Sequence, residues 1–267
     1  MGTQGVRRLR RQQDEAYVLR TQELGDADLI VTLFAMQQGL VRGVARSARK
    51  SRRRFGGYLE PLSLVEACWV EHEGRELHRL ESLEGRRSFA TMQSDPLRQA
   101  ACAVLAEVSS CYAQEAHGEP DAFRLLGAVL DAMEQGGSPR LLLRYFEYWM
   151  LRIHGLVPDV NGCGQCGNPI GKAISVTVLA GSGLLCDECS GSTNSGLNRL
   201  RPAGRKLLER IRRESPLELT TCGEAEGGGP GLERLLRGTL EAYAERSFRA
   251  YRHFTAAESL ELGGGPK

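Results

Sequence analysis

The sequence predicts an α+β protein of several domains, with a small sheet first and then a helical domain that is interrupted by a cysteine-rich insertion. Short segments rich in Val, Leu and Ile, with partial polar alternation, fill the first part of the chain. Beyond residue 90 the apolar residues recur at helical spacing. Two Cys-x-x-Cys pairs lie within this helical part, a pattern typical of a metal-binding module.

The first part of the chain contains five expected strands. They cover residues 15–22, 28–35, 40–45, 62–71 and 76–83. Gly25, Gly39 and Gly74 lie between them, where a chain reversal favours glycine. Five strands in so short a stretch favour a closed barrel of the OB type, whose exposed face and loops commonly bind single-stranded nucleic acid.

A basic run fills the expected loop between the third and fourth strands. It holds seven cations and no acid: Arg42, Arg46, Arg49, Lys50, Arg52, Arg53 and Arg54. Because the net charge is only +2, the clustering is informative, and phosphate is the expected partner since guanidinium binds it bidentately. The alternative is a flexible solvated loop. Phe55 follows the run and is a candidate for base stacking or for packing at the barrel mouth, and Tyr58 favours packing.

The helical part predicts five helices. We expect them over residues 96–111, 120–134, 139–155, 202–213 and 231–252. Asp95 is placed as an N-cap, and Pro96 as the first helical residue. The apolar residues of the third helix recur on nearly every turn, so this helix is expected at the centre of the core.

The cysteine-rich insertion predicts a zinc ribbon with one structural Zn²⁺. Its ligands are two pairs with 19 residues between them: Cys163, Cys166, Cys186 and Cys189. A two-residue spacing lets both thiolates of a tight turn reach one ion, and four thiolates leave no open position for catalysis. A zinc deaminase is the enzyme alternative, since His117 and Glu119 form H-x-E. Gly162 stands where that signature needs proline, so no catalytic residue and no enzyme activity are expected.

Composition and order set the remaining expectations. No stretch approaches the ~18–20 apolar residues that span a membrane, and the first residues are too polar for a signal peptide, so a cytoplasmic protein without membrane contact is expected. The expected organisation is a basic extension (1–13), an OB-fold domain (14–88), a first helical part (89–158), the zinc ribbon (159–193), a second helical part (194–260) and a flexible tail (261–267).

Over roughly residues 14 to 255 the chain resembles the bacterial RecO recombination mediators. The order of barrel, arginine-rich stretch and ribbon-interrupted helices carries the resemblance. So do the strings Ala16-Tyr17-Val18-Leu19-Arg20, Leu40-Val41-Arg42-Gly43-Val44-Ala45 and Arg144-Tyr145-Phe146-Glu147, the last leading to the first cysteine pair.

The resemblance implies a function in recombinational DNA repair. It implies binding of single- and double-stranded DNA, strand annealing, and loading of RecA onto DNA covered by single-stranded-DNA-binding protein. It also implies RecR as a partner, with RecF in the wider pathway, and a place on the bacterial nucleoid. Phosphate contact is assigned to the seven cations of the basic run and to Arg20.

The acidic tail of the single-stranded-DNA-binding protein ends in an apolar residue. We therefore expect a groove in the helical unit with a cation from Arg144, Arg152 or Arg205. A rival class remains open, because a transcription or translation factor can also combine an OB barrel with a four-cysteine ribbon. Such a factor would bind RNA or polymerase through the same basic loop.

Overall fold

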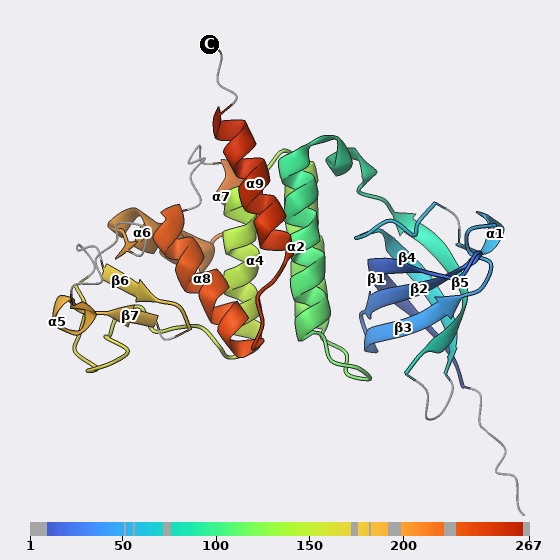
Figure 1. Ribbon diagram of the computed structural model, residues 1–267, viewed down its shortest axis with the longest axis horizontal. Helices are drawn as coiled ribbons and strands as arrows, with labels where there is room; N and C mark the ends of the chain where they lie inside the picture. Colours follow the sequence, from blue (N-terminus) through green and yellow to red (C-terminus); the bar gives the residue numbers. More distant parts are fainter. Residues whose placement is uncertain are drawn as a thin grey trace, which may run out of the picture. The chain divides into compact units, whose positions relative to one another are not determined.

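The computed structural model describes residues 10–50, 52–55, 57–71, 76–171, 176–181, 183–191, 199–221 and 228–263. The basic residues Arg7 and Arg8 lie outside this range. The chain divides into two compact units, Met1–Phe123 and Arg124–Lys267 (Figure 1).

Unit 1 is built around a closed five-stranded barrel. Its strands are β1 (Arg10–Leu24), β2 (Asp28–Ala35), β3 (Gly39–Ala45), β4 (Leu64–Glu71) and β5 (His78–Arg87), with the short helix α1 (Arg52–Phe55) between β3 and β4. The strand order around the barrel is β1-β2-β3-β5-β4, with β3 and β5 parallel and the other pairs antiparallel. The predicted OB-type barrel is therefore confirmed.

The predicted first and fifth strands end too soon, the first also begins too late, and the predicted fourth and fifth strands each begin two residues too early. β1 begins at Arg10 because its first residues pair with β4, Arg10 lying opposite Glu71. β5 continues to Arg87 through a largely charged sequence that carries no apolar alternation. β4 begins only at Leu64, since Leu62 adopts a left-handed φ of 66° that ends extended pairing.

Alternate residues of the strands fill the barrel. Val31, Leu33, Val65, Ala67 and Trp69 are fully buried in one apolar cluster. The turn between β2 and β3 packs against the loop after α2, because the Leu40 N–H donates to the Gln114 carbonyl at 2.9 Å. Gly39 has a φ of 66°, and a Cβ there would meet the Gln114 carbonyl, so this approach requires glycine.

A helical segment completes unit 1. The 3-10 turn η1 (Ala90–Ser94) leads into α2 (Pro96–Tyr112), which packs against β1 and β2. The Asp95 carboxylate accepts the N–H groups of Leu97 and Arg98 at 2.9 and 3.2 Å, which confirms the predicted N-cap.

Unit 2 consists of helices and a small ribbon. The helices are α3 (Pro120–Glu134, which begins in unit 1), α4 (Pro139–Ile153), α6 (Pro202–Ile211), α7 (Pro216–Thr221), α8 (Gly229–Tyr243) and α9 (Ala250–Gly263). The ribbon contains β6 (Val176–Leu179), β7 (Gly183–Leu185), the short helix α5 (Asp187–Ser190) and β8 (Arg199–Leu200), in the sheet order β7-β6-β8. α4 packs against α7 and α8, as its apolar sequence predicts.

The helix predicted over residues 231–252 is wrong, because two helices occupy this stretch. α8 ends at Tyr243, and the chain turns through Glu245, which has a φ of 51°. The Glu241 carboxylate accepts the Phe248 N–H at 3.1 Å and so holds the reversal. Phe248 lies beyond the end of α8 but is only 1% exposed. Buried apolar residues therefore continue past the end of the helix, and their spacing does not reveal where the helix stops.

Within the described ranges, no helix combines the length and the apolar character that a membrane crossing requires.

Candidate functional site

Two arginines lie in one row across the outer face of the barrel. Arg20 on β1 is opposite Thr32 on β2, and Thr32 is opposite Arg42 on β3. Since neighbouring strands lie about 4.8 Å apart, the row brings two cations within roughly 10 Å of each other at the backbone. Arg20 is exposed and Arg42 half-buried, and no ion pair of either is found among the described residues. This face offers two cations to an anion.

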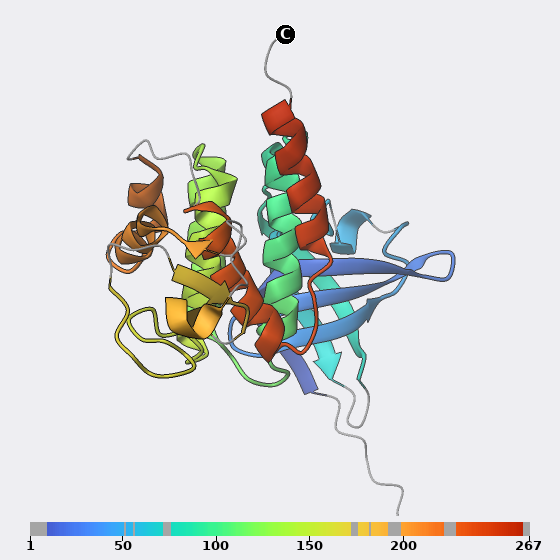
Figure 2. The same cartoon turned by 60° about the vertical axis from the view of Figure 1, so that its left-hand side comes forward.

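The loop after β3 extends this cationic surface. β1 continues past the end of its pairing with β4 at Tyr17 and forms a hairpin with β2 (Figure 2). The loop lies on this hairpin, because the Ser47 N–H donates to Asp28 at 2.7 Å and the Arg49 N–H donates to the Ala27 carbonyl at 3.2 Å. The loop is therefore held in place, and the side chains of Arg46, Arg49 and Lys50 are exposed on it.

The end of the basic run differs from the prediction at Phe55. Arg54 is exposed, and its Nη2 donates to the Arg46 carbonyl at 2.7 Å. Phe55 is 0% exposed and belongs to the barrel core, so it has no free face for a base and is removed from the contact set. Tyr58 packs on the same core, as predicted. The side chains of Arg52 and Arg53 lie outside the described part of the chain.

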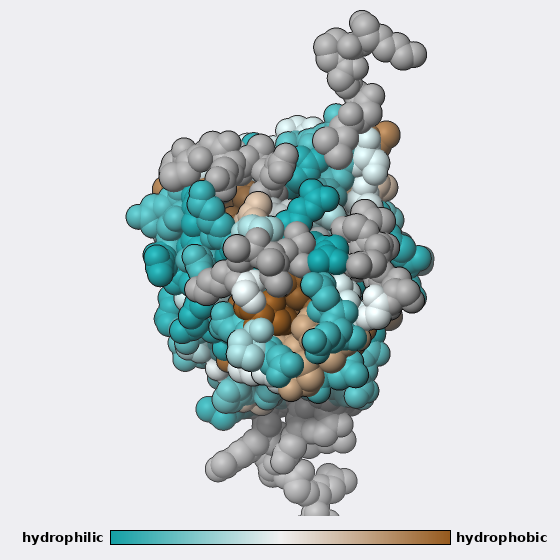
Figure 3. Space-filling view, turned by 90° about the vertical axis from the view of Figure 1, so that its left-hand side faces the viewer, coloured by the Kyte–Doolittle hydropathy of each residue, from teal (hydrophilic) through white to brown (hydrophobic). Residues whose placement is uncertain are grey.

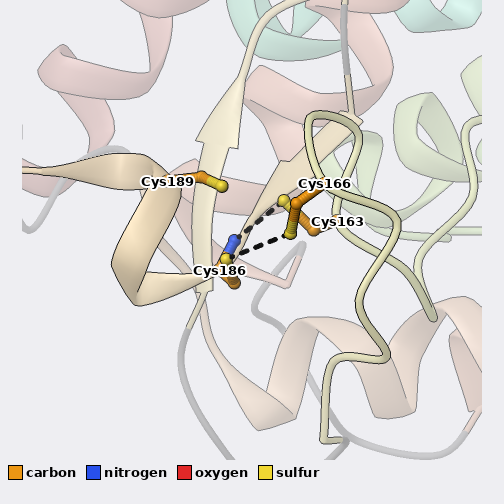
Figure 4. Close-up of side chains that lie close together, drawn as sticks. All are labelled: Cys163, Cys166, Cys186 and Cys189. Carbon is orange, nitrogen blue, oxygen red and sulfur yellow. Dashed lines mark hydrogen bonds between the residues drawn. The ribbon is translucent and has the colours of Figure 1, made fainter.

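The four ribbon cysteines converge on one point (Figure 4). All four sulfurs lie within 4.8 Å of one another, and those of Cys166 and Cys186 are 3.7 Å apart. A tetrahedral ion with metal–sulfur bonds of about 2.3 Å requires sulfurs about 3.8 Å apart. The four cysteines can therefore hold one metal ion.

The thiols of this cluster have unequal pKa values. Backbone N–H groups of Cys166 and Cys186 donate to the Cys163 sulfur and lower the pKa of that thiol to about 6. The side chains of Cys186 and Cys166 raise the pKa of Cys189 to about 12. Four thiolates so close together repel one another, and a divalent cation would offset this repulsion.

Unit 2 also contains a cavity of about 350 Å³. Tyr148 from α4, Leu208 from α6 and Leu235 from α8 supply apolar lining, and residues 157–161, here called the strap, form a further wall. Figure 3 looks onto the ribbon-bearing side of this unit, where apolar residues show in a small central area surrounded by hydrophilic ones.

Three arginines face this cavity. Arg205 is 6% exposed, and its Nη1 donates to the Val160 carbonyl at 2.5 Å. Its buried Nε and Nη2 atoms have no hydrogen-bond partner in the described structure. Burial lowers the pKa of the Arg205 guanidinium, which nevertheless stays a cation at neutral pH. Arg152 and Arg212 also line the cavity, and Asp159 and Glu209 are its acids. The cavity thus combines apolar lining residues with three arginines and two acids.

The third predicted partner residue, Arg144, does not line the cavity. It is 3% exposed, and its guanidinium pairs with Glu147 at 2.6 Å and with Glu233 at 3.5 Å. Tyr251 donates its hydroxyl to the same Glu147 oxygen at 2.7 Å. Arg144 therefore joins α4 to α8 inside the core, and its assignment to partner binding is wrong.

Sequence reasoning missed the strap and Arg212 as parts of the cavity. α4, α6, α8 and the strap are far apart in the sequence, and no spacing rule joins them. His117, predicted in an exposed loop, is exposed just before α3. Glu119 accepts the Gln114 N–H at 3.2 Å in the same loop.

These features define the chain as an α+β protein that combines an OB-type barrel, a helical unit and a four-cysteine ribbon. Comparison with protein families gives its membership. The model of the N-terminal part of Recombination protein O matches residues 9–89, and the model of its C-terminal part matches residues 93–253.

Individual relatives agree with the family models. The DNA repair protein RecO of Anaeromyxobacter dehalogenans (strain 2CP-C) is 36% identical over 250 residues, which are 92% of this chain and 96% of the relative. The DNA repair protein RecO of Anaeromyxobacter sp. (strain K) is 34% identical over 228 residues, or 85% of this chain and 88% of the relative. The chain belongs to the RecO family.

Proposed function

We propose that this protein is a DNA-binding mediator of recombinational repair in the bacterial cytoplasm, working on the nucleoid. It binds single- and double-stranded DNA, anneals complementary strands, and helps RecR load RecA onto DNA covered by single-stranded-DNA-binding protein, with RecF as an indirect partner. The observation that carries the proposal is the row of Arg20 and Arg42 beside the exposed cations Arg46, Arg49 and Lys50. The proposed phosphate contacts also include Arg52, Arg53 and Arg54.

The mechanism follows from charge. Two complementary strands repel each other through their phosphates, and guanidinium groups on one barrel face lower this repulsion as the strands meet. The bases pair without help from the protein, and no covalent bond changes. The proposed activity is therefore non-enzymatic and should weaken steeply as salt rises.

We propose one structural Zn²⁺ on Cys163, Cys166, Cys186 and Cys189. Support comes from the all-thiolate donor set and from the 3.7 Å separation of the Cys166 and Cys186 sulfurs. When bound, the ion would stabilise the ribbon and balance the thiolate charge. Elemental analysis of the purified protein, with a Cys163→Ser and Cys186→Ser double variant as control, should find one zinc per chain in the native protein only.

We propose the cavity of unit 2 as the site for the acidic tail of single-stranded-DNA-binding protein. Arg205, a lining residue whose buried Nε and Nη2 have no partner in the described structure, is the proposed partner of the terminal carboxylate, and the lining around Leu208 and Leu235 suits the terminal apolar side chain. Arg152 and Arg212 are then placed for the acidic residues that precede it.

The DNA proposal is tested by binding and annealing assays with labelled single-stranded DNA and with RNA of the same sequence. The mediator function predicts binding and annealing of DNA, and retention of RecR in a pull-down. Equal or tighter RNA binding without DNA annealing would favour the transcription or translation class.

The cavity proposal is tested with a peptide of four aspartates followed by phenylalanine. Arg205→Ala should abolish its binding, and amidation of the terminal carboxylate should weaken it at least tenfold. Arg201→Ala is the matched control, because Arg201 is an exposed arginine just before α6 that does not line the cavity. Equal binding by the Arg205 and Arg201 variants would contradict the assignment.

A further inference from the structure

The strap belongs to two sites at once. Residues 157–161 form one wall of the cavity in unit 2, and the same segment leads into Cys163, the first cysteine of the metal cluster. Its two ends are held in different ways, and this difference links the cysteine cluster to the cavity.

The N-terminal end of the strap is anchored on a helix. α4 closes with the Gly155 N–H donating to the Arg152 carbonyl at 3.1 Å and the Leu156 N–H donating to the Leu151 carbonyl at 2.7 Å. This end rests on a helix that packs against α7 and α8, and its position does not depend on a metal ion.

The C-terminal end of the strap is anchored in the turn that holds the first cysteine pair. The Ile170 N–H donates to the Asn161 carbonyl at 2.7 Å, and the Cys163 N–H donates to the Asn168 carbonyl at 2.9 Å. Of residues 161–170, only Cys163 and Ile170 are buried. A turn with so little apolar core needs another source of stability, and a bound metal ion supplies it in small modules.

The strap also meets the residue that defines the cavity. The Val160 carbonyl accepts the hydrogen bond from Arg205 Nη1, which leaves Nε and Nη2 as the free donors. If the strap moved, Arg205 would lose its fixed orientation, and the cavity would lose a wall.

We infer that a metal ion in the four-cysteine cluster fixes the position of the strap, and that tight peptide binding in the cavity depends on this position. The inference rests on the proposed function of the cavity. Val160 and Asn161 act as positioning residues, because the Val160 carbonyl orients Arg205 and the Asn161 carbonyl ties the strap to the cysteine turn. Metal loss or thiol oxidation would release the strap and weaken peptide binding, while the barrel would keep its DNA affinity.

Thermodynamic linkage makes the inference testable without a variant. If metal favours the peptide, the peptide must favour the metal by the same factor. The peptide of four aspartates and phenylalanine should therefore tighten zinc binding by the native protein. Coupling between sites in one protein corresponds to about 5- to 150-fold, so the zinc dissociation constant should fall at least fivefold.

The experiment measures the zinc affinity of the protein by equilibrium competition with a chromogenic chelator of known affinity. Saturating peptide is added to the zinc-loaded native protein and to its Arg205→Ala variant, in which the peptide should have no effect. In parallel, peptide and single-stranded DNA affinities are measured before and after zinc removal, with far-ultraviolet circular dichroism to monitor the helices. Zinc removal should weaken peptide binding at least fivefold and leave DNA binding within twofold.

An unchanged zinc dissociation constant under saturating peptide would overturn the inference, even if the metal-free protein unfolds. Equal peptide affinity in folded zinc-loaded and zinc-free protein would overturn it as well. Failure of the peptide to bind zinc-loaded protein would instead overturn the proposed peptide site, and the coupling with it.

Discussion

Removal of the two arginines in the outer-face row should reduce the salt dependence of DNA binding by a calculable amount. Each phosphate contact on single-stranded DNA contributes about 0.7 to the slope of log affinity against log salt. Arg20→Ala with Arg42→Ala removes two contacts, so the slope should fall by about 1.4. Between about 50 and about 200 mM salt, the native protein should then lose roughly sevenfold more affinity than the variant.

Fluorescence anisotropy of a labelled oligonucleotide, titrated at four or five salt concentrations, measures this slope directly. The control is Arg79→Ala with Arg86→Ala, which removes the same charge from the same barrel. Both control arginines already pair with carboxylates, Arg79 with Glu81 at 2.7 Å and Arg86 with Glu66 at 3.1 Å. The assignment of DNA binding to the outer face would be refuted if the Arg20 and Arg42 double variant kept the salt slope of the native protein. It would also be refuted if both double variants lost the same amount of slope.

Three further predictions concern stability. Tyr251→Phe removes the hydrogen bond to Glu147 and should lower the free energy of unfolding by about 1.5–3 kcal/mol in urea titrations, whereas Tyr243→Phe at an exposed site should change it little. Burial raises the pKa of Glu147 to about 7, against the opposing effects of Arg144 and Tyr251. Folding therefore favours the protonated form of Glu147. The contribution of Glu147 to the free energy of unfolding is fully present below pH 4.5, and it falls by up to roughly 3 kcal/mol as the pH rises through 7. Glu147→Gln should abolish this slope, and an unchanged slope would exclude Glu147 as its source. Asp95→Ala removes the N-cap of α2 and should cost about 1 kcal/mol in thermal unfolding, while Asp95→Asn should restore most of it.

The elements that were predicted best have their ends marked by local chemistry. α3 has the predicted bounds because a proline opens it and the apolar spacing ends with it. The sequence predicted a single helix where α8 and α9 lie. An apolar period indicates which face of a segment is buried, but it does not indicate whether the helix continues. The reversal at Glu245 depends on hydrogen bonding by Glu241, which spacing does not contain.

The functional residues divide in the same way. The cluster of four cysteines could be predicted from spacing alone, because each pair lies in a short turn. The alignment of Arg20 with Arg42 depends on strand register, and a β-bulge between Val18 and Arg20 shifts that register. Arg144 and Arg205 are both buried arginines on helices, and the difference between them is that Glu147 and Glu233 pair with Arg144, whereas a backbone carbonyl pairs with Arg205.

The position of β1 in the barrel has a consequence for synthesis of the chain. β1 pairs with β2 next to it in sequence, but also with β4, and the barrel closes only when β5 pairs with β3. On the ribosome, the β1–β2–β3 meander therefore waits with an unpaired edge until Arg87 has emerged. Non-local pairings of this kind fold slowly, and an unpaired edge can pair with another chain. The charged residues at the start of β1, Arg10 and Arg11 among them, protect that edge while the nascent chain waits for its closing strands.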